Sequence, residues 1–401
     1  MSDRTAYLVS GKRTPVGRYG GALSSVRPDD LAALTITAVI EESGIDPSVV
    51  DEVILGNANG AGEENRNVAR LAWLLAGYPD TVPGITVNRL CASGMSAIAL
   101  ATAMVESGQA DVVVAGGVES MSRAPWVQEK PRSAFAKPGE IFDTSIGWRF
   151  VNPIFQAQEK TTFSMPETAE EVARVKGVSR EEADVFAATS QARALAAISA
   201  GHFDSEIVPV EITDRKGNVT VVSQDEGPRE GTTTQVLAKL RPVVRGGEVV
   251  TAGNSSSLND GASAIIVASA EAVEKYGLTA RAKVVGASNA GLAPEIMGMG
   301  PVPATKKLLK RTGWSVEDLD AVELNEAFAT QSLACMRELE LDPEKVNAWG
   351  GAIALGHPLG SSGSRITITL LNRLEKEGGS KGIATMCIGV GQGSAIAIER
   401  V

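Results

Sequence analysis

The chain has little of several things that particular functions require. Only two histidines and three cysteines occur among 401 residues, so no disulfide framework is possible and a reducing, cytoplasmic setting is expected. No apolar stretch approaches 18 residues without a charge, and none is expected to span a membrane. An apolar run begins almost at once, at residues 6–10, so no secretory signal is expected.

Positive charge is also scarce. There are 38 Lys and Arg against 48 Asp and Glu, which gives a formal net charge of −10. Nucleic acid is therefore excluded as a bulk partner, because binding the phosphate backbone needs a basic face. A small anionic ligand would have to be held by a local basic cluster or by helix N-termini.

Glycine and apolar residues are abundant, with 42 Gly and 43% hydrophobic residues, which allows a large core with many tight turns. Residues 1–119 alternate strand-like apolar runs with helical patterns, so we predict a mainly parallel α/β sheet covered on both faces. The expected strands are 6–10, 53–55, 84–87 and 111–115, and the expected helices are 28–43, 68–76 and 95–105.

Residues 120–249 break this alternation and are richer in proline, charge and aromatic side chains. They contain two expected helices, at 167–176 and 180–200, the second preceded by a capping box of Ser179 and Glu182. We interpret the segment as an inserted domain. From about residue 271 the alternation resumes and faintly echoes the first half. If the fold is duplicated, loops of both halves meet at one interface, which is a common place for a ligand site.

Cys91 lies in V-N-R-L-C-A-S-G, between the expected strand 84–87 and the helix that follows. Unpaired N–H groups and the dipole at a helix start stabilise a thiolate, and a thiolate is a good nucleophile for a thioester carbon. The alternative is that Cys91 is simply a small buried residue.

The second cysteine of interest, Cys387, precedes I-G-V-G-Q-G. This run fits a dinucleotide-binding fingerprint only loosely, and a tight turn that exposes the thiol is the other interpretation. Cys335 falls on the apolar face of an expected helix and is assigned to core packing.

His357 lies in the glycine-rich stretch G-G-A-I-A-L-G-H-P-L-G, which permits unusual backbone angles and close approach of a ligand. It is either a catalytic base or a histidine of a surface loop. His202, in A-G-H-F, follows a helix, where a C-capping role is sufficient. Asn325, in N-E-A-F, follows the expected strand 321–324 and either orients an imidazole or water or caps a helix.

Two cysteines, a histidine and an asparagine at strand ends and glycine-rich loops suit acyl transfer. One thiol would attack a carbonyl carbon, the histidine would take its proton, and the second thiol would move a proton at carbon. Backbone N–H groups near Cys91 and Gly389 could hold an oxyanion.

These residues lie in ordered motifs that resemble the thiolase family over essentially the whole chain. The motifs are G-K-R-T-P, V-N-R-L-C-A-S-G, A-G-G-V-E-S-M-S, T-A-G-N-S-S-S-L-N-D-G-A, N-E-A-F-A, G-G-A-I-A-L-G-H-P-L-G and C-I-G-V-G-Q-G. The resemblance implies two βαβαβαββ halves in a five-layer αβαβα sandwich with an inserted loop domain that binds coenzyme A. The expected division is residues 1–119 plus 250–270, the insert 120–249, and residues 271–401. A homodimer or homotetramer is expected.

By the same resemblance, Cys91 is the acylated nucleophile, His357 activates it, and Cys387 is the general acid and base at the acetyl carbon. Asn325 would hold a water that forms one oxyanion hole with His357, and the N–H groups of Cys91 and Gly389 would form the other.

Coenzyme A contacts are implied for Ser256 and Arg229, and coenzyme A enters as a substrate, so neither a permanently bound cofactor nor a metal is expected. An arginine for a phosphate also suits an acidic chain.

Four positions depart from common family patterns: Ala92, Ser164, Ser257 and Val390. Because Ser164 stands where many members have histidine, a histidine contact to coenzyme A or substrate is not expected there. Most of the departures, with R-A-P-W-V and I-G-W-R-F-V-N-P, resemble the β-ketoadipyl-CoA thiolase subgroup. Nothing accounts for Ser257.

The resemblance therefore predicts thiolytic cleavage of a 3-oxoacyl-CoA, most specifically of 3-oxoadipyl-CoA to succinyl-CoA and acetyl-CoA. Such a substrate ends in a carboxylate, for which Arg123, Arg149 and Trp148 are candidates. The nearest alternative is an acetoacetyl-CoA or broad-range 3-ketoacyl-CoA thiolase. More distant ones are a decarboxylating condensing enzyme, against which Cys387 speaks, a non-catalytic acyl-CoA-binding or lipid-binding homologue, and a nicotinamide dehydrogenase.

Overall fold

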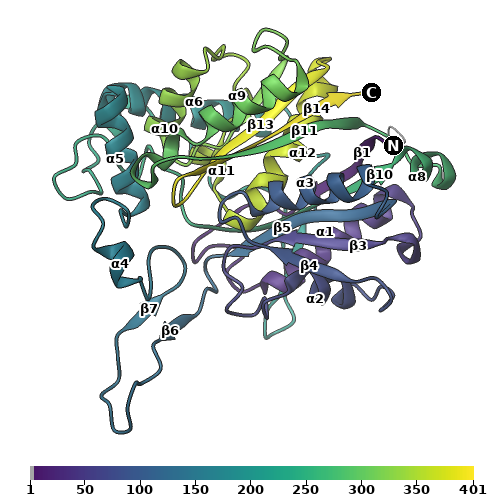
Figure 1. The fold of residues 1–401 in the computed structure, drawn as a ribbon, viewed down its shortest axis with the longest axis horizontal. Coiled ribbons are helices and arrows are strands. Elements are labelled where there is room, and N and C mark those ends of the chain that lie inside the picture. The colour runs from purple at the N-terminus through teal and green to yellow at the C-terminus, as the bar shows by residue number, and fades with distance from the viewer. Residues whose placement is uncertain (1–3) are drawn as a thin grey trace.

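Two half-sheets face each other across a pair of helices in the computed structural model, which describes residues 4–401 (Figure 1). The strands of the first half run side by side in the order β4-β3-β5-β10-β1. Their bounds are β1 Ala6–Arg13, β3 Glu52–Gly56, β4 Gly84–Val87, β5 Val112–Ser120 and β10 Asn259–Ser269. The pairs β3–β4 and β3–β5 are parallel, whereas β10 is antiparallel to both of its neighbours.

The second half repeats this order as β12-β13-β14-β11, with β14 as its antiparallel strand. The bounds are β11 Ala282–Gly291, β12 Ala321–Leu324, β13 Lys381–Ile388 and β14 Gln392–Arg400. A parallel bridge from Val322 to Val346 stands beside β12, where the first half has β4. Within residues 4–401, the two half-sheets are joined where two residue pairs link β1 to β11.

Helices complete the five layers. Between the half-sheets lie α3 (Ser93–Glu106) and α12 (Leu359–Glu377), as Figure 1 shows. The outer face of the first half is covered by α1 (Pro28–Ser43) and α2 (Val68–Leu75), and that of the second by α9 (Pro301–Thr312) and α10 (Ala329–Glu338). The predicted fold of two similar halves in an αβαβα sandwich is therefore confirmed.

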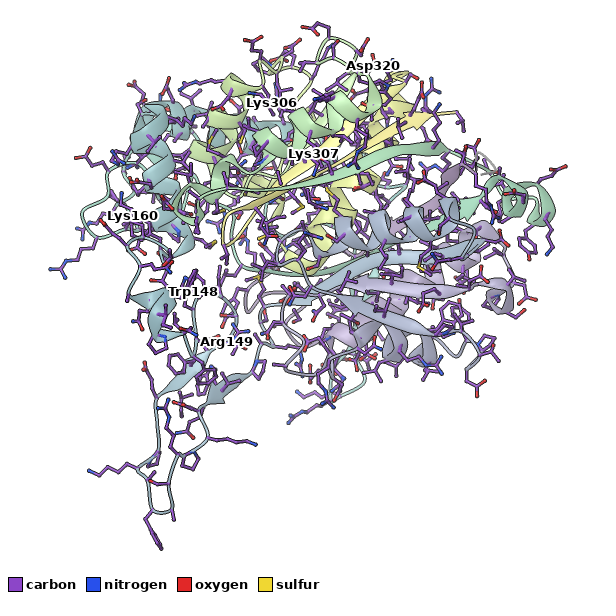
Figure 2. All side chains as sticks on the ribbon, in the orientation of Figure 1. Trp148, Arg149, Lys160, Lys306, Lys307 and Asp320 are labelled. Carbon is purple, nitrogen blue, oxygen red and sulfur yellow. The ribbon has the colours of Figure 1, made fainter. Side chains whose placement is uncertain are left out.

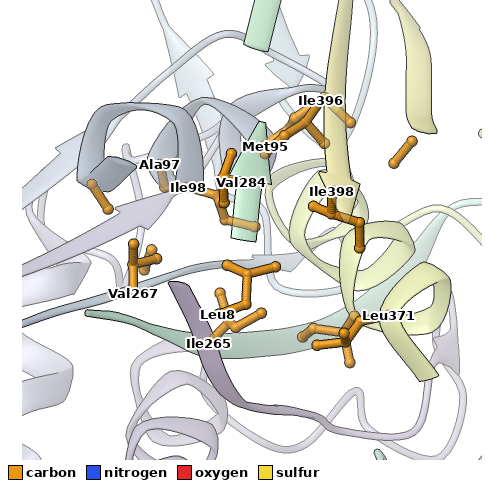
Figure 3. Close-up of a cluster of buried hydrophobic side chains, with 14 of the residues drawn as sticks. Leu8, Met95, Ala97, Ile98, Ile265, Val267, Val284, Leu371, Ile396 and Ile398 are labelled. Atoms are coloured by element: carbon orange, nitrogen blue, oxygen red, sulfur yellow. The ribbon is translucent and has the colours of Figure 1, made fainter. Parts of the chain in front are cut away.

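Successive side chains of each central strand point to opposite faces of the sheet, so one strand contributes to two hydrophobic cores. In β10, Ile265 and Val267 point into the middle layer, whereas Ile266 and Ala268 pack outward against α1 and its neighbours. Figure 3 shows the middle core, where side chains of both half-sheets meet those of the two central helices. Each large apolar side chain buried in this way contributes about 1.5–3 kcal/mol.

The central helices touch backbone to backbone near their N-termini. A Cβ added at Gly94 of α3 would lie 2.6 Å from Ser364 Oγ and 2.7 Å from Gly360 O, both on α12. One added at Gly363 would lie 2.4 Å from Met95 N. Glycine at these two positions lets the helices approach to a distance at which no side chain would fit. The two helix starts, and the loops before them, therefore lie close together.

The segment between β5 and β10 lies outside the sandwich. A hairpin of β6 (Trp126–Gln128) and β7 (Ile141–Asp143) projects from the body (Figure 1). The remaining elements are α4 (Pro153–Gln156), α5 (Met165–Lys176), α6 (Arg180–Ser199), the hairpin β8 (Val210–Thr213) with β9 (Val219–Val222), and α7 (Thr234–Leu237). The predicted capping box of Ser179 and Glu182 opens α6. The predicted bounds of the three domains stay predictions.

Short elements flank these. They are β2 (Gly17–Arg18), α8 (Ala270–Tyr276), α11 (Ala352–Leu355) and the 3₁₀ turns η1 (Pro47–Val49) and η2 (Pro294–Met299). Two strands are longer than predicted: β1 continues to Arg13 and β5 to Ser120, because buried polar residues at their ends hide the apolar pattern. Within residues 4–401, no helix has both the length and the apolar character needed to cross a bilayer.

We predict that Gly94→Ala destabilises the fold, because its methyl group would overlap backbone atoms of α12 that cannot move aside. The loss is expected at the upper end of the about 1–3 kcal/mol typical of overpacking, measured by chemical denaturation. The matched control is Gly286→Ala on β11, whose Cβ would make ordinary contacts beyond 3.5 Å and should leave stability nearly unchanged. Equal effects of both variants would contradict the close approach.

Candidate active site

A cavity of about 810 Å³ lies where the two halves meet the inserted segment. Its wall is formed mainly by apolar side chains, among which most of the predicted functional residues are gathered. They are Cys91, Ser256, His357, Cys387 and Gly389, together with Trp148 and Arg149 of the insert. The site therefore draws on both halves of the duplicated fold.

Cys91 lies between the end of β4 and the start of α3, as predicted. The preceding residue, Leu90, has a left-handed backbone with φ of 48°, which is costly for a side chain of this kind. Hydrogen bonds hold it there: Leu90 N donates to Asn88 Oδ1, and Ser93 Oγ donates to Leu90 O. The position of the thiol is thus fixed by the loop that carries it.

The prediction that Cys91 is a low-pKa thiolate is wrong. Burial raises the pKa of the Cys91 thiol to about 11, although the backbone N–H groups of Gly389 and of Cys91 itself act in the opposite direction. The loss of hydration in a mainly apolar cavity raises the pKa by more than the backbone N–H groups near the helix start lower it. The Cys91 thiol is therefore neutral at rest, and it would need a base to become a reactive thiolate.

His357 is placed to be that base, because it lines the same cavity. It is only 5% exposed, so the alternative of a surface-loop histidine is excluded. Its N–H donates to Asn259 Oδ1 at 2.9 Å, which fixes the turn between α11 and α12. Burial, and then the charge of Arg365, lowers the pKa of His357 to about 3, so the imidazole is neutral.

The hydrogen bonds of His357 define which ring nitrogen is basic. Nδ1 lies 2.6 Å from Ser362 Oγ, and that hydroxyl donates its hydrogen to Pro358 O at 2.9 Å. Ser362 must then accept from Nδ1–H, which leaves the lone pair on Nε2. The neutral imidazole is thus oriented to take a proton at Nε2.

Asn325 stands beside this nitrogen. Its Nδ2 lies 3.5 Å from His357 Nε2, and among the described residues its buried Oδ1 has no hydrogen-bond partner. The next residue, Glu326, is buried and accepts hydrogen bonds from Ser190, Asn347 and Ile353. Glu326 therefore anchors the loop, and Asn325 keeps a free acceptor next to the base.

Cys387 is 1% exposed and lies inside β13, one residue before its end, packed with Phe328, Met297 and their neighbours. A turn follows at residues 389–391, as one of the two interpretations expected, and the thiol is exposed to the cavity although it is buried from solvent. Burial raises the pKa of Cys387 well above its ordinary value, and the neighbouring Cys91 adds to the shift. Both thiols are therefore protonated at rest.

Gly389 begins the turn from β13 to β14. The next residue, Val390, has φ of 63°, a left-handed conformation that is an outlier for a β-branched residue. Gly391 O accepts a hydrogen bond from Leu292 N, and a Cβ at Gly391 would lie 2.2 Å from Leu292 O. Contacts from the η2 region thus hold the strained turn, and with it the N–H of Gly389, against the cavity.

Sequence reasoning gave no role to Glu119, the glutamate of A-G-G-V-E-S-M-S at the end of β5. Its carboxylate accepts backbone hydrogen bonds from Ala58 and Asn59 of one half and from Gly360 of the other, at 2.8–3.1 Å. Burial raises the pKa of Glu119 to about 7. The signal available in the sequence was a carboxylate that directly follows an apolar strand. In the structure, this carboxylate ties the first turn of α12 to the first half.

The other predicted ligand-binding residues divide by position. Ser256 lines the cavity, and its N–H donates to Ala327 O at 2.9 Å. Arg229 is exposed and lies outside the lining. Trp148 and Arg149 line the cavity, whereas Arg123 does not, because Glu63 holds its guanidinium at 2.5 and 2.7 Å.

The two residues to which no chemistry was assigned lie elsewhere. Cys335 is fully buried in the core around α10, which agrees with a packing role. His202 donates its backbone N–H to Ala197 O at the end of α6, and its ring stacks on Trp349 with centroids 4.6 Å apart.

A half-buried thiol, a neutral imidazole whose Nε2 carries the lone pair and a second, buried thiol on one cavity wall define an acyl-transferring enzyme of the cysteine-nucleophile class. Family models described as "Thiolase, N-terminal domain" and "Thiolase, C-terminal domain" match residues 6–271 and 278–400. The chain belongs to the thiolase family, and it is an acyltransferase.

Known proteins of similar length resemble the chain from end to end. A β-ketoadipyl-CoA thiolase of Pseudomonas aeruginosa is 57% identical, with all of both chains covered. A 3-oxoadipyl-CoA/3-oxo-5,6-dehydrosuberyl-CoA thiolase of Escherichia coli K12 is 52% identical over 99% of this chain and all of that one. The crystal structure of human mitochondrial 3-ketoacyl-CoA thiolase in complex with CoA has a TM-score of 0.92 at 41% identity, covering 99% of this chain and 98% of that one.

We predict that His357→Ala lowers kcat/KM about 10²–10⁴-fold at neutral pH, the usual contribution of a positioned base. Because the Cys91 thiol then ionises only near its own pKa of about 11, activity of the variant should rise about tenfold per pH unit over the alkaline range. The parent enzyme should not show this rise. Initial rates from pH 6 to 10 measure both.

His202→Ala is the matched control, since the other histidine of the chain lies outside the cavity lining. It should keep the activity and the pH profile of the parent. A residual activity of His357→Ala that does not change with pH would contradict the role of base.

Proposed function

We propose that the chain is a degradative thiolase that cleaves a 3-oxoacyl-CoA with coenzyme A. The observation that supports this most directly is the pair of neutral thiols, half-buried Cys91 and buried Cys387, on one cavity wall with the Nε2 face of His357. Two thiols allow one to carry the acyl group while the other handles a proton at carbon.

In the first half-reaction, His357 Nε2 takes the proton of Cys91 as its sulfur attacks the 3-oxo carbon. The Cα–Cβ bond then breaks, and its electron pair goes to the acetyl carbon. The Cys387 thiol protonates that carbon, so acetyl-CoA leaves and the acyl group stays on Cys91. The imidazolium returns a proton to Cys387, which restores both groups.

In the second half-reaction, His357 takes the proton of the coenzyme A thiol, whose sulfur attacks the acyl group on Cys91. The shortened acyl-CoA leaves, and Cys91 regains its proton from the imidazolium. The backbone N–H groups of Cys91 and Gly389 are proposed to stabilise one oxyanion, and Asn325 with a water and His357 the other. The unpartnered Oδ1 of Asn325 supports this second assignment. No resident cofactor takes part in the scheme.

For the substrate, we propose 3-oxoadipyl-CoA, which would yield succinyl-CoA and acetyl-CoA in the breakdown of aromatic compounds. Support comes from the relatives at 57% and 52% identity, whose names specify this substrate class. Coenzyme A is proposed to lie along the inserted segment, with Ser256 in the cavity and exposed Arg229 outside it, where a phosphate would remain partly hydrated.

Thiolysis of 3-oxoadipyl-CoA, acetoacetyl-CoA and a medium-chain 3-ketoacyl-CoA tests the proposal. We expect kcat/KM to be highest for the dicarboxylate, Cys91→Ala to abolish turnover, and Arg229→Gln or Ser256→Ala to raise the KM for coenzyme A. Cys387→Ala should still transfer an acetyl group from acetyl-CoA to Cys91 but lose carbon–carbon cleavage. A preference for acetoacetyl-CoA would favour the broad-range alternative, and no turnover of any substrate would refute the enzyme as described.

We further propose that copies of the chain associate through β4, which ends the sheet and leaves one row of backbone groups unpaired. Exposed apolar side chains of Ile85, Leu74 and Leu75 accompany this edge. The projecting β6–β7 hairpin, with fully exposed Phe135, would join dimers into a tetramer.

Light scattering measures this association. Ile85→Lys should shift the mass toward the monomer, whereas Val219→Lys, an exposed apolar residue on β9, should leave it unchanged. A parent enzyme that is monomeric at micromolar concentration would refute the proposed assembly.

A further inference from the structure

The charges that face the cavity are few. Among the described residues that line it, Arg149 is the one Lys or Arg, and Glu119 is the one Asp or Glu. Glu119 is not a partner for Arg149, because both of its carboxylate oxygens accept backbone hydrogen bonds. Arg149 also forms no ion pair with any residue of the described chain. A cation without a paired counter-charge therefore faces a mainly apolar cavity.

Anchors on both sides hold this arginine in place. Trp148 Nε1 donates to Phe163 O at 3.2 Å, and its ring packs against Phe155. On the other side, Phe150 adopts a left-handed backbone with φ of 50°, and its ring packs edge-on against Phe142. Figure 2 shows Trp148 and Arg149 on the part of the insert that faces the body of the molecule.

Little of the guanidinium's hydrogen-bonding capacity is used. Within the described part of the chain, it makes one hydrogen bond, a long one of 3.5 Å from Nη2 to Asn59 Oδ1. The Asn59 amide is itself fixed by Nδ2 donating to Thr144 O and Oγ1 at 3.0 and 2.9 Å. Since a guanidinium offers five N–H donors in a planar fork, most remain for a ligand.

Arg123 is a useful contrast within the same segment. Two of its nitrogens already bind the Glu63 carboxylate, and it lies outside the cavity lining. A carboxylate is the partner that a guanidinium fork fits, and Arg149 lacks one.

We propose that Arg149 binds the terminal carboxylate of the acyl chain and so makes the enzyme selective for dicarboxylic 3-oxoacyl-CoA substrates. The inference rests on the proposed thiolase function. Burying a carboxylate against apolar walls is costly unless a cation pairs with it, and such a pair is bidentate and charge-assisted. A neutral acyl chain of the same length gains nothing from the arginine and leaves it unpaired.

The test compares 3-oxoadipyl-CoA with 3-oxohexanoyl-CoA, which has the same six-carbon chain but ends in a methyl group. Arg149→Met should lower kcat/KM for the dicarboxylate about 10- to 100-fold, as expected for hydrogen bonds to a charged group. It should leave 3-oxohexanoyl-CoA unchanged or improved, which also shows that the variant is folded. Arg149→Lys should recover part of the selectivity, because it keeps the charge and loses the fork.

Arg123→Met is the matched control and should not change the ratio of the two kcat/KM values. An equal loss on both substrates, or a raised KM for coenzyme A with both, would overturn the inference and leave thiolysis intact. An unchanged ratio in Arg149→Met would do the same. Failure of the parent enzyme to cleave any 3-oxoacyl-CoA would instead overturn the proposed function, and this inference with it.

Discussion

The contact of α3 with α12 is the constraint on which the site depends. Each central helix begins directly after a loop that carries one reactive group, Cys91 before α3 and His357 before α12. The glycines at the crossing let the backbones touch, so the two loops reach one cavity. Glu119 strengthens the same junction by accepting N–H groups from both halves. A side chain at Gly94 would therefore disturb the reaction site as well as the core.

Burial at this junction determines the chemistry. It keeps the Cys91 thiol and the His357 imidazole neutral at rest. In the proposed mechanism, the charged pair therefore arises only while the acyl group is being transferred. Left-handed residues stand next to three cavity residues: Leu90 precedes Cys91, Phe150 follows Arg149, and Val390 follows Gly389. Each costs about 1–3 kcal/mol and persists because surrounding contacts hold it. The fold is thus less stable than it would be without these strained residues, which orient the neighbouring groups toward the cavity.

Local signals in the sequence predicted the strand 84–87, the capping box of α6 and the position of Cys91 before a helix, because each depends on neighbouring residues. The ordered motifs predicted the duplicated fold. The neutral state of Cys91 was not predictable, since desolvation depends on what covers the thiol in three dimensions. The sequence also could not distinguish the positions of the two arginines, because these depend on contacts in three dimensions. Arg149 lines the cavity, whereas Arg123 is paired with Glu63.

The division of labour within the molecule follows from rigidity. Cys387 lies near the end of a strand of the sandwich, and Cys91 and His357 lie in short loops directly before its central helices. A small displacement there would disrupt the proposed proton transfers. The inserted segment contributes Trp148 and Arg149, held by aromatic contacts within the insert. Changes there can alter which acyl chain is accepted without moving the reacting thiols. Selectivity for a charged chain end can therefore change by substitution at one cavity position, while the chemistry stays fixed by the layers beneath it.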